Sequence, residues 1–248
     1  GTFSTGFKGG GFEDDPANPL AAQSSYDPET VDNIEIGGKF ELFNRAARLN
    51  IAGFSMRYKD LQGTQTSDVC LCNITDNAAD AKIKGIEAEL QVLPFTGLLL
   101  SGGLTLLDTE YIEFTDSVGN VNDGKFLQRT PDYQFNVSAR YTTDLGSWID
   151  GFSANLSYSE QGGMSWNPEG SANEDGYGLL DGRISISPNP DLTFSIWGRK
   201  LTDKLYRTNA IAFFGDEETS GHHNSNDFSF HGVIGGEAVD EFTLDITC

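Results

Sequence analysis

Apolar and polar residues alternate along short stretches of the chain, and the segment 34–42 shows the pattern clearly. Its apolar members are Ile34, Ile36, Phe40 and Leu42, and its charged members are Glu35, Lys39 and Glu41. Side chains of a β-strand point alternately to opposite faces of the sheet. The segment is therefore predicted to be a strand with one apolar face and one charged face.

The same alternation returns in seven further segments. These are residues 48–61, 86–92, 98–106, 133–141, 152–158, 180–186 and 192–196. Within 48–61, the apolar residues in phase are Ala52, Phe54, Met56 and Tyr58. Together with 34–42, the pattern predicts eight strands between Val31 and Leu201. An aromatic content of 11%, with 29 Gly and only 2 Met, also favours strands over helices.

Short and long connections alternate between these strands. Short turns are predicted near residues 44–47, 93–97, 143–150 and 188–190, and long polar loops at 62–80, 108–128, 160–176 and 205–219. Amphipathic strands with short turns at one rim and long loops at the other are typical of an outer-membrane β-barrel. A soluble β-sandwich or β-helix is the alternative, with the apolar faces packed inward. The polar face favours the barrel, because Glu, Arg, Asn and Gln recur on it in strand after strand.

The composition of the chain excludes some classes of protein. With 16 Lys and Arg against 37 Asp and Glu, the formal net charge is −21, which excludes a basic nucleic-acid-binding surface. The most apolar stretch, 90–107, is interrupted by Pro94 and by three glycines, so no helical membrane span is predicted. The first residues lack the features of a signal peptide. We therefore expect the chain to start inside a longer protein.

No residue constellation points to catalysis, a metal or a cofactor. The three His residues (222, 223 and 231) lie in one late segment, and no Lys-Ser/Thr ending follows the glycine run 9–11 to make a phosphate loop. Cys70 and Cys72 are interpreted as a disulfide within a loop, and Cys248 stands apart. The sequence thus predicts neither an enzyme nor a metal site.

Six short motifs resemble one known family. They are Ser4 to Phe12, Tyr26-Asp27-Pro28-Glu29-Thr30-Val31, Tyr58-Lys59-Asp60-Leu61-Gln62, Lys84-Gly85-Ile86-Glu87-Ala88-Glu89, Arg129-Thr130-Pro131-Asp132-Tyr133 and Leu201-Thr202-Asp203-Lys204-Leu205-Tyr206. In this order, over about residues 4–215, they resemble the C-terminal part of the β-barrel of TonB-dependent outer-membrane receptors.

The resemblance implies an active importer in the bacterial outer membrane, energised by the TonB complex. Its ligand would be an iron-siderophore, cobalamin or a similar scarce nutrient, and its partners outer-membrane lipid and, through an N-terminal plug region absent here, TonB. The family barrel has about 22 strands, of which this chain would supply about ten. Residues 1–219 are taken as barrel, and 220–248 as a divergent tail, either a closing strand or a frame-altered end. A soluble secreted acidic β binding protein or adhesin, and a passive porin, are the alternatives.

Two sets of residues are candidates for function. From phase alone, the lumen-facing candidates are Lys39, Glu41, Glu87, Glu89, Asn136, Arg140, Asn155 and Arg183. They would line a hydrated interior or hold a plug, or else form a solvated face without a specific partner. The long loops would face outward and meet ligand. Candidates for stacking on ligand are Tyr111, Phe114, Trp166, Phe213 and Phe214.

Overall fold

The computed structural model describes residues 1–12, 25–67, 72–116, 119–146, 149–213, 217–223, 227–234 and 242–247. Its strands are β1 (Thr2–Lys8), β2 (Gly11–Phe12), β3 (Ser25–Tyr26), β4 (Glu29–Leu42), β5 (Ala47–Ser67), β6 (Cys72–Phe95), β7 (Leu98–Phe114), β8 (Tyr133–Thr143), β9 (Gly151–Gln161), β10 (Met164–Ser165), β11 (Asn173–Glu174), β12 (Tyr177–Asn189), β13 (Leu192–Arg199), β14 (Tyr206–Phe213), β15 (Glu217–His223), β16 (Asp227–Ile234) and β17 (Phe242–Thr247). Within these residues, no helix is long and apolar enough to cross a membrane.

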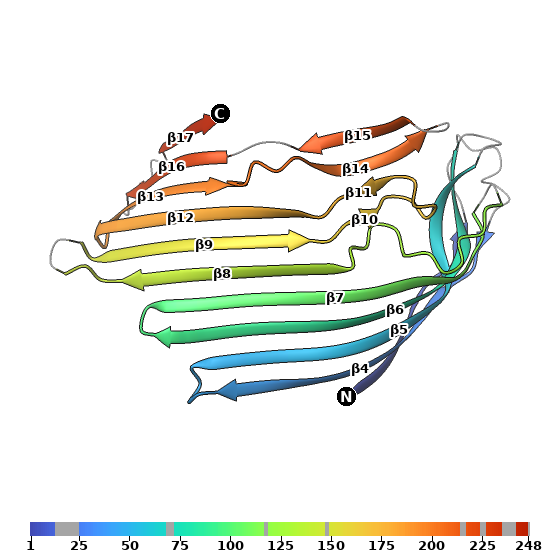
Figure 1. The fold of residues 1–248 in the computed structure, drawn as a ribbon, viewed down its shortest axis with the longest axis horizontal. Coiled ribbons are helices and arrows are strands. Elements are labelled where there is room, and N and C mark those ends of the chain that lie inside the picture. Colours follow the sequence, from blue (N-terminus) through green and yellow to red (C-terminus); the bar gives the residue numbers. More distant parts are fainter. Residues whose placement is uncertain are drawn as a thin grey trace.

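A single curved antiparallel sheet forms the body of the molecule (Figure 1). Its eleven strands follow the order β1-β4-β5-β6-β7-β8-β9-β12-β13-β16-β17. Neighbours in this sheet also follow one another along the chain, apart from three short two-stranded additions: β2-β3, β10-β11 and β14-β15. The predicted all-β, antiparallel barrel wall is confirmed, and the described part of the wall is open, with β1 and β17 at its two edges.

The two ends of the sheet differ as predicted. At one end, tight turns join β4 to β5, β6 to β7 and β12 to β13. The β6–β7 turn uses Gly97 at φ +92°, where a Cβ would clash with the Thr142 carbonyl. The β4–β5 turn instead holds three successive non-glycine residues, Phe43, Asn44 and Arg45, at positive φ. Long connections occupy the opposite end.

Strands β5, β6 and β7 extend much further than the sequence pattern predicted. β5 runs to Ser67 and β6 begins at Cys72, so most of the predicted loop 62–80 is strand. Similarly, β7 continues to Phe114, and β14 and β15 occupy part of the predicted loop 205–219. In these extensions the ladder of backbone hydrogen bonds continues where the apolar alternation has stopped. Those predicted loop boundaries were therefore wrong, because alternation marks only the part of a strand that needs an apolar face.

Cross-strand register assigns each residue to one of two faces. One row, on the convex face, joins Ile36, Gly53, Ile86, Leu106 and Tyr133. Directly paired residues point to the same side of a sheet, so the rows alternate between the faces. The concave face carries the intervening polar rows.

Apolar side chains on the convex face are exposed rather than packed into a protein core. Ile36 is 73% exposed, and Leu104, Val137, Leu156, Ile184 and Ile196 are all exposed as well. The clusters of buried hydrophobic residues in the described chain lie instead at the long-loop end, around Tyr111 and around Trp166. The soluble alternative required these faces to pack inward, and on that point it is wrong. An exposed apolar band of this size is typical of a surface that a membrane or another protein covers.

Aromatic residues border the apolar band at both ends. Tyr133 lies at the long-loop end, where its hydroxyl donates to the Glu160 carboxylate at 2.8 Å. The Tyr158 hydroxyl reaches the same carboxylate at 2.6 Å from the middle of the band, where Tyr158 pairs with Val137. Tyr141 and Phe152 lie at the short-turn end with ring centroids 6.5 Å apart. Tyr133 and Tyr141 are eight residues apart in β8, about 27 Å along the strand, or about 21 Å in height at a tilt of ~40°. That height approaches the ~25 Å apolar band of outer-membrane barrels.

Val137 lies midway between these aromatic borders on the convex face, which yields a test of the lipid-facing assignment. In the complete gene product folded into lipid vesicles, Val137→Arg should lower the free energy of unfolding by about 2–4 kcal/mol, because it places a charge at the bilayer midplane. The matched control is Ser138→Arg on the concave face, expected to cost less than about 1 kcal/mol. Urea titration measures both, and equal losses for the two variants would contradict the assignment.

Candidate functional site

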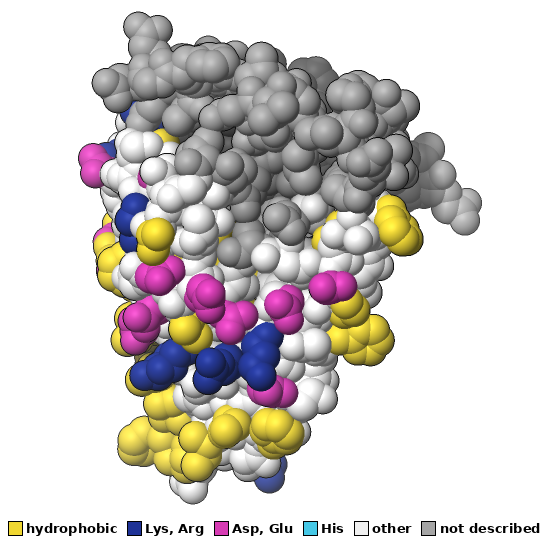
Figure 2. Space-filling model, turned by 90° about the vertical axis from the view of Figure 1, so that its right-hand side faces the viewer, with side chains coloured by type: hydrophobic (Ala, Val, Ile, Leu, Met, Phe, Trp, Pro, Cys, Tyr) yellow, Lys and Arg dark blue, Asp and Glu magenta, His cyan; other side chains and the backbone are white. Residues whose placement is uncertain are grey.

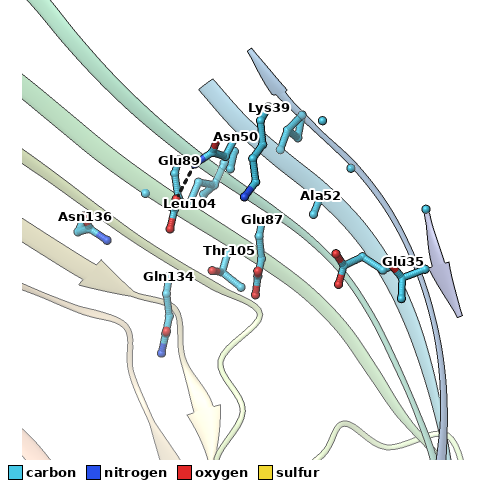
Figure 3. A pocket seen from close by; sticks show the side chains of 17 residues that line it. Glu35, Lys39, Asn50, Ala52, Glu87, Glu89, Leu104, Thr105, Gln134 and Asn136 are labelled. Carbon is cyan, nitrogen blue, oxygen red and sulfur yellow. Dashed lines mark hydrogen bonds between the residues drawn. The ribbon is translucent and has the colours of Figure 1, made fainter. Parts of the chain in front are cut away.

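A hollow of about 650 Å³ lies against the concave face, over β4 to β8 (Figure 3). Polar and charged side chains from successive strands point into it: Glu35, Lys39, Asn50, Glu87, Glu89, Thr105, Gln134 and Asn136. Register explains the convergence, since Lys39 pairs with Asn50, Asn50 with Glu89, Glu89 with Gly103 and Gly103 with Asn136. One row of the sheet thus carries four polar side chains and one glycine.

The glycine in this row makes room for its neighbour. A Cβ at Gly103 would lie 2.9 Å from the Asn136 side-chain nitrogen, closer than such atoms approach. With hydrogen in its place, Asn136 lies across β7 and reaches the hollow. The position of the Asn136 side chain therefore depends on the absence of a side chain at Gly103.

The hollow is acidic and keeps unused polar groups. It is lined by three glutamates, at 35, 87 and 89, and a single lysine, Lys39. Glu89 accepts a hydrogen bond from the Asn50 side chain at 3.1 Å. Lys39 makes no ion pair within 4.0 Å among the described residues. The Lys39 ammonium therefore remains available to a polar partner on the concave face.

The other lumen-facing candidates lie elsewhere on the concave face. Glu41 pairs with Arg45 at 3.1 Å and Arg48 at 3.7 Å, close to the β4–β5 turn. A second row joins Arg140, Asn155 and Arg183 across β8, β9 and β12. Arg183 donates to the hydroxyls of Ser185 and Ser195 at 3.3 and 3.0 Å. The structure thus brings Lys39, Glu87, Glu89 and Asn136 together and separates them from the remaining four.

A second hollow, of about 620 Å³, lies between the β7–β8 and β9–β12 loops. Lys125, Phe126, Thr130, Met164 and Glu174 are among the residues that line it. The phase of the strands gives no information about these loop residues, so the sequence prediction missed them. The one available signal was charge, because Lys125 is a cation in a chain of net charge −21.

The two loops are fixed to the sheet and to each other. The Leu127 backbone N–H donates to the Thr109 hydroxyl at 3.1 Å, and the Arg129 N–H donates to the Ser165 carbonyl at 2.6 Å. The Lys125 ammonium donates to the Asn122 side chain at 2.8 Å and to the Glu169 carbonyl at 3.2 Å. The second hollow therefore has defined walls on both sides.

Three of the aromatic residues predicted to stack on ligand are buried. Tyr111 and Phe114 are only 4% and 5% exposed, with ring centroids 4.8 Å apart, and pack against Ala79 and Ala81. Trp166 is 7% exposed and packs against Ala172 and Met164. In this arrangement the three rings hold the loops together and offer little surface to a ligand. Phe126, at 69% exposure, is the aromatic residue that the second hollow presents.

Several sequence candidates lie outside the described part of the chain. Cys70 and Phe214 are not described, and of Cys72 and Phe213 only the backbone is, at the ends of β6 and β14. The proposed disulfide and two of the stacking residues stay predictions. Among the described residues, no cluster of three or more His, Cys, Asp or Glu side chains is arranged to hold a metal ion.

These features define a class of protein. A sheet with an exposed apolar convex face, a polar concave face and long loops at one end is typical of the wall of an outer-membrane β-barrel. The chain matches the family model "TonB dependent receptor-like, beta-barrel" over residues 1–201 and belongs to that family. It is thus part of an outer-membrane receptor barrel, as the sequence motifs implied.

Solved structures show the same fold at low sequence identity. The ferric yersiniabactin uptake receptor FyuA from Yersinia pestis is 17% identical with a TM-score of 0.76, over 98% of this chain and 34% of that one. The siderophore receptor PiuA from Acinetobacter baumannii is 17% identical with a TM-score of 0.64, over 88% and 29%. BauA, the ferric preacinetobactin receptor of the same organism, is 19% identical with a TM-score of 0.64, over 93% and 33%. The chain spans about a third of the length of these receptors. No curated protein sequence matches it.

Asn167 organises the loop that carries Trp166, and this yields a second test. Its side-chain oxygen accepts the backbone N–H groups of Ser171 and Ala172, each at 3.1 Å. Asn167→Ala leaves both donors without this partner, at a local cost of about 1–3 kcal/mol. We expect faster amide hydrogen exchange at residues 171 and 172 by about tenfold or more.

The matched control for Asn167→Ala is Asp175→Ala, an exposed residue of the same loop. It should leave exchange at residues 171 and 172 within about twofold of the wild type. Unchanged exchange in Asn167→Ala would show that its side chain does not hold the loop.

Proposed function

We propose that this chain forms part of the wall and the outer loops of an active transporter that imports a ferric siderophore, using energy from the TonB complex. Membership of the TonB-dependent receptor-like family carries this proposal. The siderophore receptors that share its fold support a ferric siderophore as the ligand. Cobalamin or another scarce nutrient remains the second candidate ligand.

The acidic hollow on the concave face is proposed to contact a plug domain. Lys39 and Glu87, with the neighbouring Glu89 and Asn136, offer donors and acceptors that the sheet itself leaves largely unused. A plug seated there would be held by hydrogen bonds and ion pairs that a hydrated lumen can exchange for water. Such contacts suit a plug that moves during transport, because each one is individually weak. Arg140, Asn155 and Arg183 are proposed to line the same lumen.

The hollow between the loops is proposed to contact the ligand. Its volume of about 620 Å³ falls in the usual range for small-molecule sites, about 300–1,000 Å³. Phe126 and Met164 offer apolar contact, and the Lys125 ammonium contributes positive charge beside them. Many ligand sites combine apolar walls with a few placed polar groups in this way. Contact with TonB is proposed for the plug region of the family.

Uptake by living cells tests the transport proposal. Deletion of the complete gene should abolish uptake of radioactive iron from at least one ferric siderophore, and re-expression should restore it. The same uptake should stop when TonB is removed, because the step against a gradient needs that energy. Uptake that persists without TonB would contradict the proposal and support the passive porin. Iron uptake unaffected by deletion, with cobalamin uptake lost, would transfer the proposal to cobalamin.

A single substitution tests the loop hollow as the ligand site. Phe126→Ala in the complete gene product should weaken binding of the imported ferric siderophore by about tenfold, because aromatic contact area is lost. Val121→Ala is the matched control, an exposed apolar residue in the same loop that does not line the hollow. Quenching of intrinsic fluorescence by the ligand gives both affinities. Equal affinities for the two variants would remove the hollow from the ligand site.

A further inference from the structure

Basic residues gather on the outer face of the sheet, directly beside the apolar band. Figure 2 shows Lys and Arg side chains side by side, with hydrophobic side chains on one border and acidic ones on the other. Register places Arg57 (β5) opposite Lys82 (β6), with Lys84 two residues further along β6 and Lys59 two residues beyond Arg57. We call these four residues the basic belt. They make up four of the 16 Lys and Arg in a chain of net charge −21.

The convex face carries this belt. Lys84 lies in the row that contains Ile34 and Ser55, and Arg57 and Lys82 lie in the next row towards the long loops. On the other side of Lys84, the row of Ile36, Ile86 and Leu106 reaches Tyr133, in the aromatic border. Adjacent rows on one face are about 6.6–6.8 Å apart along a strand. Along the strands, the belt therefore begins one row beyond the apolar row that reaches Tyr133, on the side of the long loops.

Two like charges face each other at the centre of the belt. Residues paired directly across two antiparallel strands have Cβ atoms about 4.5–5.5 Å apart, and like charges in that position destabilise a sheet. Arg57 and Lys82 form such a pair. An anion bound between them would remove the repulsion and use the donors of both side chains.

Acidic neighbours do not neutralise the belt. Asp32 is paired with Arg57, Glu110 with Lys82 and Asp108 with Lys84, so three carboxylates lie next to the four cations. Yet none of the four cations makes an ion pair within 4.0 Å among the residues described. Asp32 and Glu110 lie on the outer sides of the Arg57–Lys82 pair, and the donors between the two cations stay available.

We propose that the basic belt binds the phosphate of a phosphorylated lipid headgroup in the outer leaflet. Its depth and its charge carry this proposal together. Long basic side chains at the edge of an apolar band place their alkyl stems along it and their charge at the headgroups, where anionic lipids attract them by about 1 kcal/mol each. A soluble anion would need no apolar border, whereas a lipid uses both parts of the surface. The inference depends on the membrane location and is independent of the transported ligand.

A matched pair of double variants tests the lipid site. The complete gene product is purified in neutral detergent and titrated with micelles that contain a bis-phosphorylated lipid or the same lipid after phosphatase treatment. Arg57→Gln with Lys82→Gln should weaken binding of the phosphorylated lipid by about 30-fold, from two lost headgroup attractions. Arg45→Gln with Lys204→Gln removes the same charge elsewhere and should change affinity less than about twofold.

Folding and ligand chemistry are controlled separately. Arg57→Lys with Lys82→Arg keeps both charges and should keep binding within about threefold, and the folded-barrel mobility of every variant is checked on SDS gels. The phosphatase-treated lipid should bind the wild type as weakly as the phosphorylated lipid binds the glutamine double variant. Equal loss in both glutamine double variants, equal binding of both lipids, or displacement by inorganic phosphate at the affinity of the lipid would each overturn the proposal.

Discussion

Every backbone N–H and C=O group inside a lipid bilayer needs a hydrogen-bond partner within the protein, because hydrocarbon supplies none and each unpaired group costs several kcal/mol. The structure meets this requirement through neighbour-to-neighbour antiparallel pairing, with one strand after another added to a single sheet. Tight turns between consecutive strands keep the connections short on one side. The two faces of the sheet and the positions of its loops follow from this continuous ladder of backbone hydrogen bonds. In the part described, β1 and β17 each have one paired side, so a barrel in lipid must close over both edges.

Once the ladder is fixed, the period of two separates two kinds of chemistry on one wall. The convex face exposes apolar residues such as Ile86 and Leu104, and aromatic residues border this apolar band. The concave face, only one residue out of phase, carries Lys39, Glu87 and Asn136 into a polar hollow. A shift of register by one residue would exchange these faces. Register is thus as important to function here as the identity of any side chain.

The sequence predicted most strands of the sheet well, because a face exposed to a membrane needs an apolar residue at every second position. It predicted the ends of the strands poorly. Beyond the apolar band, β5 and β6 continue as a hairpin, and because the residues there are polar on both faces, the sequence shows no alternation of apolar and polar positions. Residues 52–58 show a related difficulty. Ala52, Phe54 and Met56 alternate as a lipid-facing strand would, yet register pairs them with Gly37, Glu35 and Asn33 on the concave side. Periodicity gives the spacing of a face, and only pairing between strands tells which face it is.

Loop aromatics are the hardest residues to assign from sequence, because an aromatic side chain in a long loop either contacts a ligand or packs against its neighbours. Tyr111, Phe114 and Trp166 were assigned to ligand contact, whereas their rings lie in small clusters that hold the loops together. Nothing in the local sequence distinguishes them from Phe126, which is exposed beside the second hollow. The difference arises from tertiary packing of segments far apart in the chain.

A single strand of this wall is expected to divide lipid from water residue by residue. Nitroxide spin labels at each position from 133 to 141 of the complete gene product in native outer membrane test it most directly, with Cys70, Cys72, Cys248 and any further native cysteine replaced by serine. Collision with oxygen should be high at 135, 137 and 139, and collision with a water-soluble nickel complex high at 134, 136 and 138, with a period of two. A profile in which both faces contact water equally, or both contact lipid, would contradict the assignment of this chain to an outer-membrane barrel wall.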